Sequence, residues 1–109
     1  MKHNLDTNTN TLSLAFPGDV LSTNVDTLRQ SAFGLLEGEQ LKRASWTTLK
    51  LDLTAAKMVD SAGLNLIVSI IKHAKNRGAA VRATVGNPNV YRTFIFTRLD
   101  KQLDLSQAA

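Results

Sequence analysis

The stretch 49–81, LKLDLTAAKMVDSAGLNLIVSIIKHAKNRGAAV, gives the clearest indication of the fold. It opens inside the pattern of 47–53, where leucines alternate with polar residues, as in a strand with one buried face. Residues 61–77 then carry apolar side chains at helical spacing, and Gly78 follows them as a typical C-terminal residue of a helix. The stretch therefore predicts a strand, a connection over 54–60 and a long helix buried on more than one side.

The residues before this stretch predict one more strand and one more helix. Thr11–Phe16 (TLSLAF) alternates apolar and polar residues, which predicts a half-buried strand. Apolar residues recur at helical spacing over 25–36, after three candidate N-cap residues at 22–24. We expect a loop over 37–46, and a flexible segment or edge strand over 1–10.

The residues after this stretch predict a strand over 79–85 and a further helix. Asn87 can cap that helix, because Pro88 suits the first helical position, where no N–H is needed, and the helix is expected to run to about Leu99. A last short strand around 103–105 and a tail at 106–109 complete the chain. Alternating strands and helices predict an α/β single domain over 11–105, with a mostly parallel sheet of four to five strands packed by three to four helices.

Composition limits the functions that the chain can have. The 109 residues are 43% hydrophobic, which suits one domain with a real core. Cysteine is absent, so disulfides, thiol catalysis and thiolate zinc sites are excluded. No run approaches the roughly 20 apolar residues of a membrane span, and the polar start lacks the apolar core of a signal peptide. These features predict a cytoplasmic protein that does not insert into a membrane.

The charges and the histidines do not indicate catalysis or nucleic-acid binding. The net charge is +4, and the basic surplus lies entirely in the second half, spread out as on solvated helix faces. No aromatic residues interleave with these charges, so we expect no direct nucleic-acid partner. His3 and His73 have no carboxylate at metal-binding spacing, so we expect no metal site, no cofactor and no enzyme. The open alternative is a small α/β enzyme with a site at Asp60 and Ser61.

The segment 59–64, VDSAGL, is the strongest candidate for a functional site. It precedes the long helix, and loops at the carboxyl ends of strands are where open α/β sheets bind ligands and partners. One reading is structural, because Asp60 or Ser61 is a natural N-cap. The other is that Ser61 is a phosphorylation site, since a phosphate of about −1.5 to −2 charges is favourable at a helix N-terminus.

The chain resembles the STAS domain, and more narrowly the small bacterial anti-sigma factor antagonists. The resemblance covers roughly 11–105 and is carried by a strand at 49–53, the motif Asp-Ser-small-Gly-Leu at 60–64 and the turn Arg77-Gly78. Asn87-Pro88 at a helix start and the aromatic Phe94 within that helix also match. The resemblance implies a STAS-like fold and a binding module in place of an enzyme.

The resemblance also implies a switch and its residues. Family members bind a GHKL-type serine kinase that is an anti-sigma factor, and so release a sigma factor. The kinase phosphorylates the serine that corresponds to Ser61, which breaks the interaction, and a phosphatase restores it. Asp60 would order the loop, Gly63 would be a position where bulk clashes, and Asp60, Ser61, Ala62, Gly63 and Asn65 would bind the partner. We expect a monomer.

Two alternatives stay within the same fold. STAS subunits of phospholipid-trafficking ABC transporters share the loop motif and clamp an ATPase without a phosphoswitch. A STAS component of a larger stress-signalling scaffold would again be regulated at Ser61.

Overall fold

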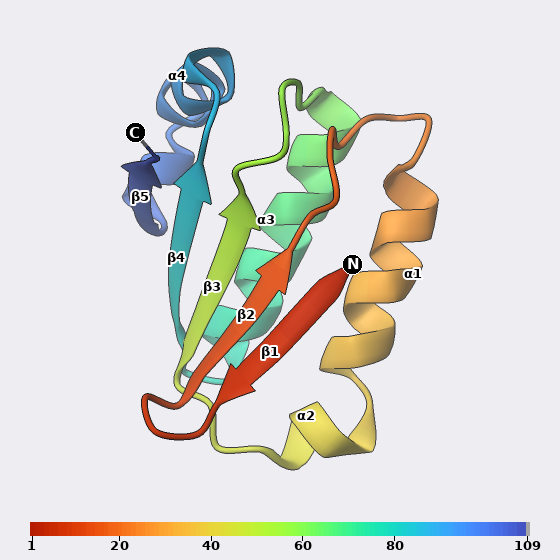
Figure 1. Ribbon diagram of the computed structural model, residues 1–109, viewed down its shortest axis with the longest axis vertical. Helices are drawn as coiled ribbons and strands as arrows, with labels where there is room; N and C mark the ends of the chain where they lie inside the picture. Colours follow the sequence, from red (N-terminus) through yellow and green to blue (C-terminus); the bar gives the residue numbers. More distant parts are fainter. Residues whose placement is uncertain (109) are drawn as a thin grey trace.

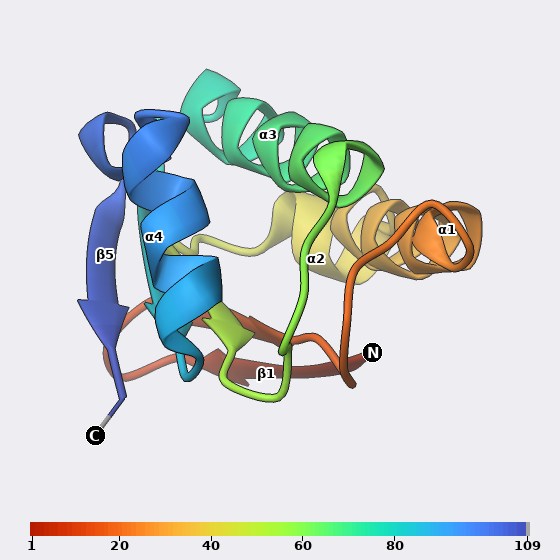
Figure 2. The same ribbon diagram turned by 90° about the horizontal axis from the view of Figure 1, so that it is seen from above.

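The computed structural model, which describes residues 1–108, shows five strands in one sheet with helices packed against one of its faces (Figures 1 and 2). The elements are β1 (Lys2–Asp6), β2 (Thr11–Ala15), α1 (Val25–Leu36), α2 (Glu39–Arg43), β3 (Thr48–Leu53), α3 (Ser61–Asn76), β4 (Ala80–Val85), α4 (Pro88–Phe96), the 3-10 turn η1 (Leu99–Lys101) and β5 (Asp104–Gln107). The predicted α/β domain with four to five strands and three to four helices is confirmed.

The sheet has the strand order β1-β2-β3-β4-β5. β1 pairs antiparallel with β2, so the N-terminal segment is an edge strand, and the other neighbours pair in parallel. A helix connects each parallel pair, as parallel strands require. The sheet is therefore mixed, with parallel pairing throughout β2 to β5. The carboxyl ends of these four strands lie at one end of the molecule, the top of Figure 1.

The core lies between the sheet and the helices α1 and α3. The buried side chains from β2, β3, β4 and α3 are Leu12, Leu14, Leu49, Leu51, Leu53, Val81, Ala83, Val85, Leu66, Ile67, Ile70, Ile71 and Ala74. Burial of each large aliphatic side chain stabilises the fold by about 1.5–3 kcal/mol. The opposite face of the sheet is polar, with Ser13, Lys50 and Arg82 side by side in register. This alternation explains why the strand pattern was readable in the sequence.

Two boundaries predicted from the sequence are wrong. The loop expected over 37–46 contains the short helix α2, which starts after Gly38 and is anchored by the buried Leu41. The tail expected at 106–109 is partly strand, because β5 continues to Gln107 through its backbone pairing with Val85. Pairing across a sheet edge adds strand residues that have no apolar pattern of their own.

Two further sequence expectations concern helix ends. α4 ends at Phe96, short of the expected Leu99, because Arg98 adopts a left-handed conformation (φ 61°) that no α-helix can continue through. The expected caps are in place at α3 and α4, where Asp60 and Asn87 accept backbone N–H groups. Gly78, with φ +84°, ends α3 as the sequence predicts.

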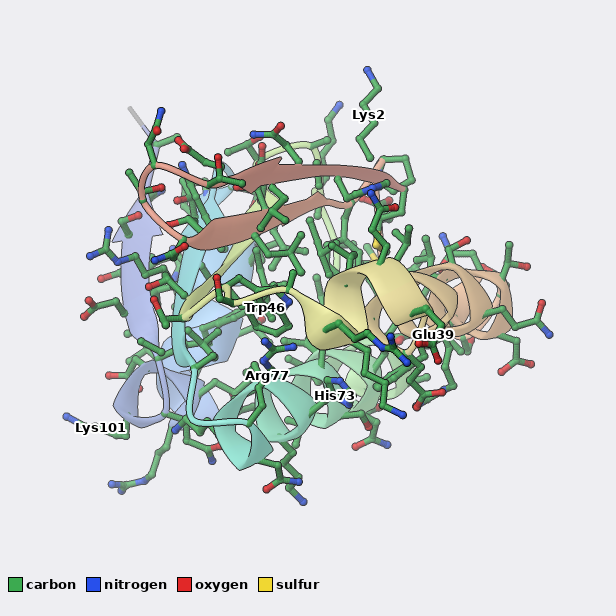
Figure 3. The ribbon with its side chains drawn as sticks, turned by 90° about the horizontal axis from the view of Figure 1, so that it is seen from below. Lys2, Glu39, Trp46, His73, Arg77 and Lys101 are labelled. Carbon is green, nitrogen blue, oxygen red and sulfur yellow. The ribbon has the colours of Figure 1, made fainter. Side chains whose placement is uncertain are left out.

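An aromatic and cationic pair closes the end of the molecule that lies opposite the strand carboxyl ends. Figure 3 shows Trp46 and Arg77 pointing toward one another, and the guanidinium carbon of Arg77 lies 3.7 Å from the ring centroid. Arg77 also donates hydrogen bonds to the carbonyls of Leu41 (3.2 Å) and Ala44 (2.6 Å). The buried Trp46 donates from Nε1 to the Leu41 carbonyl (2.9 Å). These contacts fix the chain between α2 and β3 against the end of α3.

Candidate functional site

Two loops meet at the carboxyl ends of β2 and β3, one over 16–24 and the other over 54–60 (Figure 1). Val20 and Val59 form an isolated parallel bridge between them. The Val20 N–H donates to the Met58 carbonyl (3.1 Å), and the Asp60 N–H donates to the Val20 carbonyl (3.2 Å). The parallel pairing of β2 and β3 therefore resumes beyond the sheet. It fixes the end of the second loop, directly before α3, against the first loop.

Two carboxylates tie these loops to each other from opposite sides. Asp19 Oδ1, in the first loop, accepts the N–H groups of Lys57 (2.7 Å) and Met58 (3.1 Å) in the second. Asp60 Oδ2, in the second loop, accepts the N–H of Ser22 (2.8 Å) in the first. Both carboxylates therefore join segments nearly forty residues apart in the chain (|i−j| of 38 and 39).

Asp60 also caps α3. Its Oδ1 accepts the Gly63 N–H at 2.9 Å, so the carboxylate satisfies one free amide at the helix start and one in the neighbouring loop. The Gly63 N–H, followed by the Ser22 N–H, lowers the pKa of Asp60 below its ordinary value, because both hydrogen bonds favour the charged form. Of the two cap candidates in the sequence, the structure selects Asp60 and leaves the Ser61 hydroxyl without a capping role.

Ser61 is the first residue of α3 and is exposed, and its hydroxyl makes no hydrogen bond to any part of the chain that the structure describes. Asn65 lies one turn further along and is also exposed, so the two residues share one helix face. Ala62 is half-buried. The helix start thus presents a free hydroxyl, an amide and a small side chain to the solvent.

Gly63 differs from its neighbours because it is buried against the first loop. A Cβ at this position would lie 2.1 Å from the Val20 carbonyl oxygen and 2.8 Å from the Val20 carbonyl carbon. Backbone atoms in a bridge cannot move aside, so only glycine fits. A side chain at position 63 would therefore clash with the first loop of this chain, whether or not a partner is bound.

Three features of this site were not found from the sequence. Asp19 gave no signal, because its bonds depend on a loop far away in the chain. Asn24 lies at the N-cap of α1, but its side chain accepts the Leu21 N–H (2.9 Å) and donates to the Asp19 carbonyl (2.8 Å), which shapes the first loop. A groove of about 120 Å³ runs between the second loop and α4, with Met58 and Thr93 among the residues on its two sides.

His73, one of the two histidines that the sequence analysis weighed as a metal ligand or catalytic group, lies apart from the site. His73 packs edge-on against Phe33, with ring centroids 5.6 Å apart, between α3 and α1. Among residues 1–108, no three or more His, Asp or Glu side chains are grouped to hold a metal ion. Within the same residues, every helix is too short or too polar to cross a membrane.

The whole described chain matches a known domain family. The STAS domain model matches residues 2–108, and the chain therefore belongs to the STAS family. Among solved structures it is similar to TM1081 of Thermotoga maritima, a candidate anti-sigma factor antagonist, with a TM-score of 0.79 and 19% identity over 98% of this chain and 86% of that one.

Two other solved structures are similar over comparable lengths. An anti-sigma factor antagonist from Mycobacterium paratuberculosis has a TM-score of 0.74 and 17% identity, over 96% of this chain and 84% of that one. The Bacillus cell fate determinant SpoIIAA in its phosphorylated form has a TM-score of 0.66 and 16% identity, over 99% and 92%. At these identities the likeness establishes a common fold. No curated protein matches the chain.

Proposed function

We propose that this protein is an anti-sigma factor antagonist that is regulated by phosphorylation at Ser61. In this role it binds a GHKL-type serine kinase that acts as an anti-sigma factor, and so releases a sigma factor. The observation that carries the proposal is the exposed, unbonded Ser61 hydroxyl at the start of α3, beside loops that Asp19 and Asp60 hold in place. Structural neighbours that are anti-sigma factor antagonists, one of them phosphorylated, support it.

The geometry suits a switch that changes a surface while the fold stays intact. A phosphate on Ser61 would add about −1.5 to −2 charges at neutral pH. The helix N-terminus tolerates that charge, and the cap is made by Asp60, whose bonds do not involve the Ser61 hydroxyl. The added charge would therefore act on a bound partner, by repulsion and by the cost of burying it in an interface.

Each residue of the site has a distinct part in the proposal. Asp60 orders the loop, and Gly63 brings the start of α3 against the first loop. Ser61, Ala62 and Asn65 form the surface that the kinase contacts. The protein would act in the cytoplasm as a monomer without enzymatic activity of its own, and a phosphatase would remove the phosphate from Ser61.

The test is calorimetric binding of serine-kinase anti-sigma factors from the same genome to two variants. Ser61→Ala should bind the kinase and resist phosphorylation, whereas Ser61→Asp should bind at least about 30-fold more weakly, as expected for an uncompensated charge in a close interface. Ser45→Asp is the matched control, because Ser45 is exposed at the opposite end of the molecule. Equal affinities of wild type and Ser61→Asp would contradict the proposal. In a pull-down with the wild-type protein, recovery of an ABC-type ATPase in place of a kinase would favour the transporter alternative.

A further inference from the structure

Three large apolar side chains are exposed in residues 1–108: Phe96 at 79%, Met58 at 59% and Ile95 at 40%. A single exposed apolar side chain is common on protein surfaces. A phenylalanine that is 79% exposed is not explained by packing of the fold. The position of Phe96 relative to Met58 and Ser61 is therefore informative.

Met58 and Phe96 border one continuous surface. Met58 lies on one side of the groove, three residues before Ser61, and Asn89 and Thr93 of α4 line the other side. Positions 89, 93 and 96 are spaced by four and three residues, so they share one side of α4. Phe96 therefore continues the α4 wall of the groove. Ile95, two residues from Thr93, faces a different direction.

The rim of this surface carries two cationic side chains. Lys57 lines the groove, and Arg92 lies on the exposed side of α4, one turn before Phe96. Neither makes an ion pair within 4 Å in the part of the chain that the structure describes. Asp19 and Asp60, the carboxylates of the two loops, keep their negative charge, but they accept backbone N–H groups and form no ion pair with Lys57 or Arg92. In the described residues the two rim cations therefore have no ion-pair partner, and they are available to acidic side chains of a partner.

We propose that Met58 and Phe96 are apolar anchors for the serine kinase, whose docking surface combines an apolar pocket with acidic side chains. This rests on the proposed function and extends its contact surface from Ser61 across the groove to α4. A second copy of the chain is a poorer occupant, because it would bring its own Lys57 and Arg92 to the interface and no acidic surface that matches these two cations. An acidic partner surface also explains why phosphorylation would break the complex, since a phosphate on Ser61 would face the partner's carboxylates.

The experiment is calorimetry with each purified GHKL-type serine kinase of the same genome, in low and high salt. Phe96→Ala should weaken binding about 30-fold, as for an interface hot spot, and Met58→Ala should weaken it less. Ile95→Ala is the matched control, an exposed apolar residue on another side of the same helix, and should stay within about twofold of wild type. All three variants should keep the wild-type thermal midpoint, since these side chains are exposed.

A charge pair tests the acidic character of the partner. Arg92→Glu should weaken binding about tenfold and reduce its dependence on salt, because a rim charge acts through screened attraction. Arg82→Glu, on the polar face of the sheet away from the helices, is the control and should bind as the wild type does. Equal losses of affinity in Arg92→Glu and Arg82→Glu would contradict the assignment of Arg92 to the docking surface.

The outcomes separate the two proposals. If a kinase binds the wild type and Phe96→Ala equally well, the α4 surface is wrong and the proposed function stands. If no kinase binds the wild type, both proposals fail. If Phe96→Ala instead abolishes a dimer in sedimentation, or abolishes binding to phosphatidylserine vesicles, the occupant is a second copy or a membrane and the kinase anchor is overturned.

Discussion

The two ends of the sheet are closed in opposite ways. At the carboxyl end, Asp19 and Asp60 tie two partly exposed loops together by accepting backbone N–H groups, and the exposed Ser61 hydroxyl beside them makes no hydrogen bond in the described residues. At the other end, Trp46 is 2% exposed, and the Arg77 guanidinium lies over its ring while donating to backbone carbonyls. The carboxyl end is held by solvent-exposed hydrogen bonds between carboxylates and backbone N–H groups. The opposite end is held by the buried Trp46 ring and the Arg77 guanidinium.

The contrast between the two ends explains how a charge could be added at Ser61 without a change of fold. The buried end gains stability from packing, so a change there is felt by the whole fold. The exposed end gains its shape from hydrogen bonds that do not use the Ser61 side chain, so a change of charge at Ser61 leaves the shape in place. Variants of Trp46, Gly63, Asp60 and Ser61 should show this contrast, with effects on stability that decrease in that order.

Trp46→Ala should have the largest effect on stability. It removes a buried aromatic ring, the support for the Arg77 guanidinium and the bond to the Leu41 carbonyl. We expect a loss of about 3–5 kcal/mol in the free energy of unfolding, measured by urea denaturation. Trp46→Phe keeps a ring and should lose less than half of that. A loss under about 1 kcal/mol for Trp46→Ala would mean that this end is not a packing anchor.

Gly63→Ala should destabilise the fold by about 3 kcal/mol at the carboxyl end of the sheet, because its Cβ would overlap the Val20 backbone. Gly34→Ala is the control: it lies in α1 with nothing within 4 Å of an added Cβ, and it should gain about 0.5–1 kcal/mol. Both are measured by thermal unfolding. A Gly63→Ala variant as stable as the wild type, with altered kinase binding only, would place Gly63 in the interface and not in the fold.

Asp60→Asn should weaken the acid dependence of stability. The folded pKa of Asp60 is lowered, chiefly by the Gly63 N–H and then by the Ser22 N–H, so its contribution is complete above the unfolded pKa of about 3.9. It is lost as pH falls through the folded pKa. The variant should therefore be less stable than wild type near neutral pH and should lose less stability on acidification. Thermal midpoints measured from neutral pH down through the pKa of Asp60 check this expectation. Ser61→Ala, which keeps both bonds, should follow the wild-type curve.

Ser61→Ala and Ser61→Asp should have the smallest effects on stability, within about 0.5 kcal/mol of the wild type. The residue is exposed and caps nothing, and an aspartate in the first turn suits the helix dipole. Urea denaturation measures both. A loss of more than about 2 kcal/mol in Ser61→Asp would show that charge at this position disturbs the fold, and the surface switch would then be untenable.

Local pattern carries most of what the sequence predicted. The leucines of β3 alternate, Asn87-Pro88 starts α4, and Gly78 ends α3, because each of these signals depends only on near neighbours. Asp60 was identified as a cap candidate for the same reason. Features made by distant partners were missed.

The features that the sequence missed share that cause. Asp19 binds amides 38 and 39 residues away, and the Arg77 guanidinium reaches carbonyls more than thirty residues before it. α2 is five residues long and is held by the burial of Leu41 more than by helix propensity. Phe96 has no place in the sequence analysis, because an apolar residue within a helix is ordinary, and only the completed fold shows that it is exposed.

Phosphorylation of Ser61 is tested by intact-mass analysis of the protein purified from its native cells in several growth states, with fragmentation to locate any added group. We expect a single phosphate on Ser61 in at least one state, in a protein whose thermal midpoint matches that of the unmodified form. A protein that carries no phosphate on Ser61 in any state, or a phosphate elsewhere, would contradict the switch.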